Sequence, residues 1–368
     1  MTSSATLEID QFLPSFAPKD AIGHHTLKMQ EVLRSLGIRS EIYSDEIKGE
    51  LQGLAHPFAK FTRQRYRRRR YILYQASTGS PIVRYLSGRR EPILINYHNI
   101  TPKDILGRWD PGVAMVVGQG VKQLSVLRDR IIGAISVSQY NKWCLKQEGI
   151  TDHSFVAAPF IPLSRKAGTG LEAGFDRSSQ PASKWLFVGR IAPNKAQHDI
   201  IEAFSAYRLG WDPNARLTLV GSVSSQNYAS SLEELIRSLG IVESVDLTGP
   251  VDDASLERHY REATVFVCLS DHEGFGFPII EALDHSIPVV AFASTAIPET
   301  LGNSGILLSS KEPLQVAAAV ALVEADPRLR DDLRERSQRT LTRYSFDAAK
   351  QENLSALKNL IPEMAEYL

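Results

Sequence analysis

The sequence predicts an α/β protein built from two doubly wound, Rossmann-like parallel-sheet domains that face each other across a cleft. The chain has 368 residues, more than one ordinary domain core contains. From residue 184 onward, short apolar runs alternate with segments of helical spacing, and the N-terminal half repeats this alternation less regularly. Residues 164–183 are rich in Gly, Ser, Ala and Pro and break both periodicities, which is typical of a linker between domains.

Six strands are expected in the C-terminal half, each a short run rich in Val, Leu, Ile and Phe. They are residues 184–189, 215–221, 244–249, 264–270, 288–294 and 305–309. Most are separated by segments with apolar side chains three or four positions apart, such as Ile200, Ile201 and Phe204. Strands that alternate with helices require right-handed crossovers, which produce a parallel sheet covered on both faces.

The N-terminal half contains further strand candidates and a clear amphipathic helix over residues 25–36. The strand candidates are residues 6–13, 39–44, 71–77, 91–98, 131–138 and 154–161. We therefore expect an N-terminal domain over residues 1–175 and a C-terminal domain over residues 176–345. A final helix at about 346–368 is expected to pack back on the first domain.

The composition argues against several classes of protein. With 43% apolar and 23% charged residues, the chain contains no run near the ~18 apolar residues that a membrane-spanning helix needs. The first residues show no basic segment followed by a long apolar one, so the cytoplasm is the expected compartment. Cys144 and Cys268 lie in apolar-periodic segments and indicate neither a disulfide framework nor a metal knuckle. A net charge of zero argues against a nucleic-acid partner.

Two cations follow the first strand of the C-terminal half. Arg190 comes directly after this strand, and Lys195 lies five positions later, beside a helix that begins near residue 196. A helix N-terminus carries unpaired N–H groups and a partial positive charge, so these groups together favour binding of a di-anion such as a diphosphate. The alternative is that Arg190 and Lys195 are solvated loop cations.

An acidic, glycine-rich turn, DHEGFGFP, follows the fourth strand of this half. Glu273 lies in the turn, and Glu281 lies about one helical turn into the helix that follows. The glycines let the backbone approach a ligand, and Pro278 suits the first turn of a helix. The separation of the two carboxylates fits the two ends of an extended ligand that carries hydroxyl groups. A glycosidase-type acid and base pair is the competing interpretation, and Glu281 alone could be a solvated helix residue.

These motifs in combination resemble a known family. The stretches VGRIAPNK, EGFGFPIIE and PVVAFASTAIPETLGNSGILL resemble the C-terminal half of the retaining glycosyltransferases of family 4, also called glycosyl transferases group 1, which have the GT-B architecture. Their spacing of Glu, seven residues, Glu is met by Glu273 and Glu281. The resemblance is strong over residues 184–310 and looser over 6–160. It implies that the domain over residues 1–175 binds the acceptor and that the domain over residues 176–345 binds the nucleotide sugar.

The resemblance implies a retaining hexosyltransferase that needs no metal and no other cofactor. Its donor would be a nucleotide-diphosphate sugar, GDP-mannose or a UDP-hexose, and its acceptor a glycan or lipid-linked molecule in surface polysaccharide or glycoconjugate biosynthesis. The sequence agrees in showing no Asp-x-Asp triplet and no His/Cys cluster with metal-ligand spacing. Two alternatives stay open, namely a same-fold transferase with a soluble small-molecule or sugar-phosphate acceptor, and a catalytically silent nucleotide-sugar-binding protein.

The resemblance also implies a role for each matching residue. Arg190 and Lys195 would hold the diphosphate and stabilise its charge as it leaves, Glu273 would lie by the sugar hydroxyls, and Glu281 would bind the ribose. His98, at a strand end in the N-terminal half, would contact the transferred sugar, unless it has a core or capping role. The other expected donor-binding positions are Gly23, Gly189, Gly221, His272, Gly274, Phe275, Gly276 and Glu299. Gly23 follows Ala21-Ile22 in place of the paired glycines common in the family.

The stretch FTRQRYRRRR, residues 61–70, carries six arginines in ten positions. Arg67, Arg68, Arg69 and Arg70 are expected to form an acceptor or membrane surface, because each cation near an anionic membrane contributes about 1 kcal/mol. This expectation would bring the protein to the inner face of the membrane. A solvated helix face or loop is the alternative, and nucleic-acid binding is a third interpretation that the zero net charge weakens.

Overall fold

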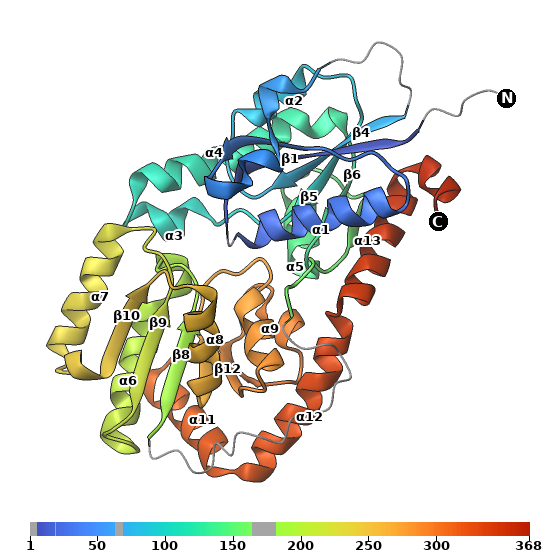
Figure 1. Ribbon diagram of the computed structural model, residues 1–368. Helices are drawn as coiled ribbons and strands as arrows, with labels where there is room; N and C mark the ends of the chain where they lie inside the picture. The colour runs from blue at the N-terminus through green and yellow to red at the C-terminus, as the bar shows by residue number, and fades with distance from the viewer. Residues whose placement is uncertain (1–5, 19, 63–68, 164–181) are drawn as a thin grey trace. The chain divides into compact units, whose positions relative to one another are not determined.

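The computed structural model describes residues 6–18, 20–62, 69–163 and 182–368 (Figure 1). The chain divides into two compact units, the first made of Met1–Lys103, Gly112–Pro162 and Tyr344–Leu368, and the second of Asp104–Pro111 and Leu163–Arg343. The sequence placed the short segment Asp104–Pro111 in the N-terminal domain, whereas its contacts group it with the second unit.

The first unit contains a seven-stranded parallel sheet in the order β3-β2-β1-β4-β5-β6-β7. The strands are β1 (Glu8–Phe16), β2 (Ile42–Ile47), β3 (His56–Pro57), β4 (Arg70–Ala76), β5 (Ile93–Tyr97), β6 (Ile131–Ser136) and β7 (Ser154–Val156). All six predicted strands are present, and the two-residue β3, which has too few residues to show a pattern, is the additional one.

The helices of this unit are α1 (Ala21–Ser35), α2 (Ile82–Ser87), α4 (Pro111–Leu127), α5 (Gln139–Gln147) and α13 (Phe346–Leu360). Helix α3 (Lys103–Gly107) lies, except for its first residue, in the short segment that groups with the second unit. Helices α1 and α13 share one apolar core with the sheet, to which Met29 and Leu33 of α1 and Leu357 and Leu360 of α13 all belong. Figure 1 shows the two helices (blue and red). The last helix of the chain thus belongs to the first unit.

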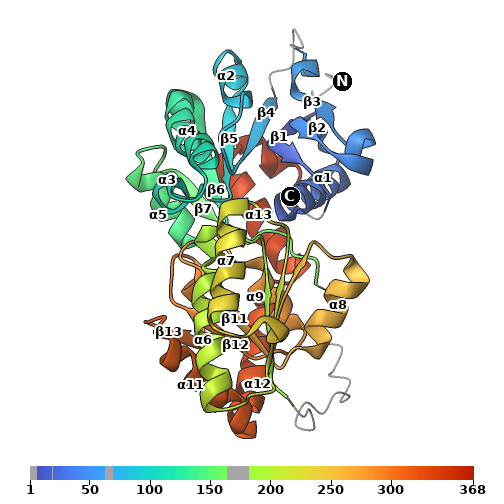
Figure 2. The same cartoon turned by 90° about the vertical axis from the view of Figure 1, so that its left-hand side faces the viewer.

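The second unit contains a six-stranded parallel sheet in the order β10-β9-β8-β11-β12-β13. The strands are β8 (Lys184–Val188), β9 (Arg216–Val220), β10 (Val245–Gly249), β11 (Val265–Cys268), β12 (Val289–Phe292) and β13 (Ile306–Leu308), which confirms the six predicted runs. The helices are α6 (Gln197–Gly210), α7 (Gln226–Ser238), α8 (Asp253–Glu262), α9 (Phe277–Asp284), α10 (Ile297–Leu301), α11 (Pro313–Ala325) and α12 (Pro327–Arg343). Helices α6 and α11 pack together, and α9 packs against α12 (Figure 1, Figure 2).

The strand order explains where ligands are expected to bind in the second unit. Strand β8 pairs with β9 on one side and with β11 on the other. The loops that follow β8 and β11 therefore begin on neighbouring strands, although the two strands are the first and the fourth of this sheet along the chain. Ligands of open α/β sheets bind beyond the carboxyl ends of the strands at such a reversal of strand order. No helix in the described ranges is long and apolar enough to cross a membrane.

Candidate functional site

Two turns meet beyond the carboxyl ends of β8 and β11. The first is the 3-10 turn Pro193–Lys195, and the second contains Asp271 and His272. The backbone oxygen of Asn194 accepts hydrogen bonds from the N–H groups of Asp271 (3.0 Å) and His272 (3.3 Å), and the Asn194 side chain donates to the His272 oxygen (3.3 Å). A buried asparagine therefore fixes the two turns against each other.

Lys195 and Glu273 form an ion pair across these turns, with 2.5 Å between Nζ and Oε1. The hydroxyl of Ser270 donates to the same carboxylate oxygen at 2.9 Å. The two charged side chains are only 16% and 11% exposed. Because an ammonium group carries three donors, one can bind Glu273 while the others stay available to an anion. The structure thus brings together two residues that the sequence separates by 78 positions.

A third turn, between β12 and α10, supports the Glu273 turn. The N–H of Glu273 donates to Oγ1 of Thr295 (2.9 Å), and the Ser294 hydroxyl donates to the Ser270 oxygen (2.5 Å). Thr295 has a φ of 47°, in the left-handed region that a β-branched residue rarely occupies. Such strain persists only where surrounding contacts impose it, and it is concentrated at functional sites.

Arg190 lies directly beyond β8 and is exposed. Within the described ranges, its guanidinium group has no hydrogen-bond or ion-pair partner, whereas its backbone oxygen accepts from the Gln197 side chain at 2.9 Å. The residue before α6, Ala196, has a left-handed φ of 50°, so the chain turns sharply between Lys195 and the helix. The backbone at Arg190 is thus fixed while its cationic group is free to bind a ligand.

Two glycines let neighbouring strand ends approach closely. Gly189 follows β8 with φ of 153°, and Gly221 follows β9 with φ of 146°. A Cβ atom on Gly221 would lie 2.1 Å from the backbone oxygen of Gly189, a distance that no side chain can occupy. Gly276, another expected donor-binding position, precedes α9 with a left-handed φ of 96°.

The acidic turn itself is largely buried. His272 is 5% exposed, and burial lowers the pKa of its imidazole to about 4, so the ring is neutral near pH 7. Phe275 is buried as well, and its backbone oxygen accepts a hydrogen bond from the Thr300 hydroxyl at 2.6 Å. Gly274 is half-buried. The turn therefore presents backbone and the carboxylates of Asp271 and Glu273 rather than a charged histidine.

The two remaining carboxylates lie on helices. Glu281 of α9 accepts a hydrogen bond from the Tyr260 hydroxyl of α8 at 2.6 Å, and burial raises the pKa of this carboxyl. The Tyr260 ring stacks on His285, with 4.9 Å between ring centroids. Glu299 of α10 lies 3.7 Å from a guanidinium nitrogen of Arg343. Glu281 is thus held by a neighbouring helix, which the sequence did not indicate.

Lys311 is a cation near this site that the sequence analysis missed. Its Nζ donates to Asp199, in the first turn of α6, at 2.7 Å and also to Asp271. It neutralises the negative charge that Asp199 would otherwise bring to the N-terminus of α6. Nothing in the sequence pairs Lys311 with residues 40 and 112 positions away.

The expected residues of the first unit lie beyond the carboxyl ends of its strands. His98 follows β5 and is half-buried, with Nε2 2.7 Å from Oε1 of Gln75, and burial lowers its pKa to about 3. Gly23, an expected donor-binding position, lies in the first turn of α1, where its N–H donates to the capping Asp20 at 2.9 Å.

The expectation for the arginine run is wrong at Arg70. This residue lies in β4 with 9% of its surface exposed, pairs with Glu8 and Asp10, and stacks on the Phe61 ring. A buried guanidinium group that two carboxylates already bind is not available to a membrane surface. Arg69 pairs with Glu366 at 2.6 Å, and Arg67 and Arg68 lie outside the described residues.

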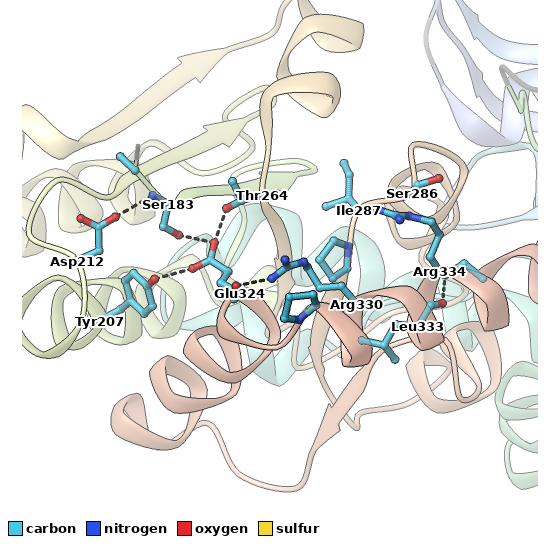
Figure 3. A pocket seen from close by; sticks show the side chains of 14 residues that line it. Ser183, Tyr207, Asp212, Thr264, Ser286, Ile287, Glu324, Arg330, Leu333 and Arg334 are labelled. Atoms are coloured by element: carbon cyan, nitrogen blue, oxygen red, sulfur yellow. Dashed lines mark hydrogen bonds between the residues drawn. The ribbon is translucent and has the colours of Figure 1, made fainter. Parts of the chain in front are cut away.

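A cavity of about 390 Å³ lies at the amino ends of the strands of the second sheet, next to the residues that precede β8, β11 and β12 (Figure 3). The hydroxyls of Ser183, Tyr207 and Thr264 converge there on the carboxylate of Glu324 (Figure 3). This carboxylate thus accepts three hydrogen bonds from internal hydroxyls. The expected site residues do not line the cavity. Among the described residues, no group of three or more His, Cys, Asp or Glu side chains is arranged to hold a metal ion.

Residues 177–340 match the family model described as glycosyl transferases group 1. The chain is 30% identical over 224 residues to the D-inositol 3-phosphate glycosyltransferase of Kineococcus radiotolerans, which covers 56% of this chain and 51% of that protein. A second protein with the same name, from Geodermatophilus obscurus, is 38% identical over 150 residues, or 38% of this chain and 33% of its own length. The chain spans about a third to a half of the curated relatives it matches.

Solved structures match over nearly the whole chain. A glycosyltransferase from Rickettsia africae has a TM-score of 0.71 at 15% identity, covering 97% of this chain and 99% of that one. Anabaena HepE in complex with UDP-glucose has a TM-score of 0.70 at 17% identity, covering 96% and 99%. These similarities confirm the expected two-domain GT-B fold.

Proposed function

Because residues 177–340 match the family model of the glycosyl transferases group 1, we propose that the chain transfers a hexosyl group from a nucleotide-diphosphate sugar to an acceptor hydroxyl. The observation that carries this proposal is the pair of cations beyond β8. Lys195 is held by Glu273 at 2.5 Å, and the exposed Arg190 lies five positions before it. We further propose that the transfer retains the configuration of the sugar and needs no metal.

The proposed chemistry follows from how charge moves during transfer. As the glycosidic bond breaks, positive charge develops at the anomeric carbon and negative charge on the departing diphosphate. Preorganised cations stabilise the negative charge in the transition state, and a neighbouring carboxylate favours the positive charge. Arg190 and Lys195 would serve the diphosphate, and Glu273 would lie on the sugar side. Glu281 would accept hydrogen bonds from the ribose.

Donor binding gives the first test. We expect one of UDP-glucose, UDP-galactose, UDP-N-acetylglucosamine and GDP-mannose to raise the melting temperature, since a ligand at 100 times its Kd stabilises the fold by about 2.7 kcal/mol. UDP-glucose is the first to test because HepE was solved in complex with it. The variant Arg190→Gln should weaken this binding, and Arg237→Gln, on the exposed face of α7, is the matched control. No shift with any of the four donors would count against the proposal.

Retention and metal independence have separate tests. Proton NMR of the first product formed should show the anomeric configuration of the donor, and an inverted product would exclude retention. Turnover should be unchanged in excess EDTA, and a loss restored by a divalent cation would exclude metal independence.

The acceptor has two candidates. A glycan or lipid-linked acceptor follows from the sequence resemblance, and a soluble phosphorylated acceptor is favoured by relatives named D-inositol 3-phosphate glycosyltransferases. Radiolabelled donor incubated with inositol 3-phosphate and, separately, with a membrane lipid extract distinguishes the two. Cytoplasmic location and membrane contact stay predictions, and equal flotation with anionic and neutral vesicles would remove the latter.

A further inference from the structure

A chain of side-chain amides runs through the first sheet and ends at His98. Gln11 of β1 and Gln75 of β4 are both fully buried. The Gln11 amide nitrogen donates to the Thr26 backbone oxygen at 2.9 Å, and the Gln75 amide nitrogen donates to Oε1 of Gln11 at 2.9 Å. Oε1 of Gln75 then lies 2.7 Å from Nε2 of His98.

This series of hydrogen bonds ends at a backbone carbonyl oxygen, which fixes the orientation of both amide groups. A carbonyl oxygen can only accept, so Gln11 must turn its nitrogen toward Thr26 and its oxygen toward Gln75. Gln75 must then turn its nitrogen toward Gln11 and its oxygen toward His98. A carboxamide oxygen also only accepts, so the proton of the His98 ring must be on Nε2. Reversing any amide would place two acceptors or two donors against each other in a buried sheet, which costs about 1–3 kcal/mol for each unsatisfied group.

The other ring nitrogen of His98 is consequently a bare acceptor. Within the described ranges, Nδ1 of His98 has no hydrogen-bond partner, and the residue is half-buried rather than enclosed. Burial lowers the pKa of the ring to about 3, so Nδ1 does not take a proton near neutral pH. The titratable neighbour is His25 of α1, whose ring centroid lies 5.4 Å away and whose Nδ1 accepts the Phe160 N–H.

We propose that Gln75 and Gln11 are positioning residues that hold His98 with its proton on Nε2, so that Nδ1 accepts a hydrogen bond from a hydroxyl group of the bound sugar. This inference rests on the proposed function for the identity of the ligand as a sugar. An Nδ1 acceptor repels a phosphate oxygen, which is also an acceptor. His98 therefore selects the hydroxyl-bearing part of the donor and not its diphosphate.

Nitrogen-15 NMR of protein labelled at histidine tests the tautomer directly. The His98 signals, identified by their loss in His98→Asn, should show a protonated Nε2 and a bare Nδ1, unchanged between pH 5 and 8. In Gln75→Met the two tautomers should mix. The control Gln30→Met removes another buried glutamine of this unit, which donates to Ser40, and should leave the His98 signals unchanged. A wild-type ring protonated on Nδ1 would overturn the proposal whether or not the variants fold.

Kinetics test the functional half of the proposal. Gln75→Met should lower kcat/KM for the donor about 10- to 100-fold while the Kd of the free nucleoside diphosphate stays within about twofold, because only the sugar loses a contact. An equal loss in nucleotide binding would instead indicate a structural role and refute the assignment. If no donor is turned over at all, the proposed function fails, while the tautomer remains decided by the spectra of the wild-type protein.

Discussion

Replacing Lys195 with methionine should destabilise the second unit strongly, because it leaves the Glu273 carboxylate without its cation. That carboxylate is 11% exposed and, among the residues that the structure describes, would keep only the Ser270 hydroxyl as a donor. Breaking a buried ion pair on one side costs about 3–5 kcal/mol, and the retained donor places the expected loss near 3 kcal/mol. For a domain of this size, the melting temperature should fall by roughly 6–12 °C.

The double variant distinguishes loss of the pair from general damage. Glu273→Gln alone should cost less, since the ammonium of Lys195 is 16% exposed and sits on a flexible stem that can reach water. Adding Glu273→Gln to Lys195→Met removes the unpaired charge, so the double variant should regain about 1–3 kcal/mol relative to additivity. Urea unfolding of the wild type and the three variants measures this coupling. Effects that add within about 0.5 kcal/mol would refute the view that the pair stabilises the two turns.

Three further predictions concern the same unit. Tyr260→Phe leaves the half-buried Glu281 without its donor, so nucleoside diphosphate binding measured by calorimetry should weaken about tenfold, and an unchanged Kd would contradict a role for this contact. Gly221→Ala places a Cβ 2.1 Å from a backbone oxygen, so urea unfolding should show that the free energy of unfolding falls by about 2–3 kcal/mol or more. The control is Gly210→Ala, where a Cβ would meet no described atom within 4 Å, and it should change this free energy by under about 0.5 kcal/mol. Burial lowers the pKa of His272 to about 4, so the unfolded chain binds more protons than the folded one between about pH 6.5 and 4. The free energy of unfolding should therefore fall as the pH drops through that range. The variant His272→Asn should reduce this fall, and an unchanged pH dependence would contradict the assignment to His272.

Strand positions and the main motifs could be predicted because each depends on neighbouring residues. An apolar run such as residues 264–270 reports burial on both faces of a parallel sheet, and the structure places β11 within it. Arg190, Lys195 and Glu273 could be singled out because they follow such strands directly. Short elements such as β3 gave no signal, since two residues cannot show a period.

The partners of the site residues could not be predicted, because they come from distant parts of the chain. In the sequence, Tyr260 looks like any other aromatic residue on the apolar side of a helix. Its hydroxyl reaches Glu281 only because α8 and α9 lie together in the folded chain. The prediction that Arg70 forms an acceptor or membrane surface failed for a related reason. Its neighbours in sequence are cationic, but its neighbours in space are Glu8 and Asp10 on β1.

The contacts of Asn194 have a consequence for how related chains can vary. Its backbone oxygen accepts hydrogen bonds from two N–H groups of the opposite turn, and its side chain donates to a carbonyl oxygen of that turn. The conformation of each turn therefore depends on that of the other. Deleting one residue from either would shift three hydrogen bonds out of register at once. Insertions and deletions in the two turns should therefore occur only as paired events, however freely the surface connections elsewhere change length.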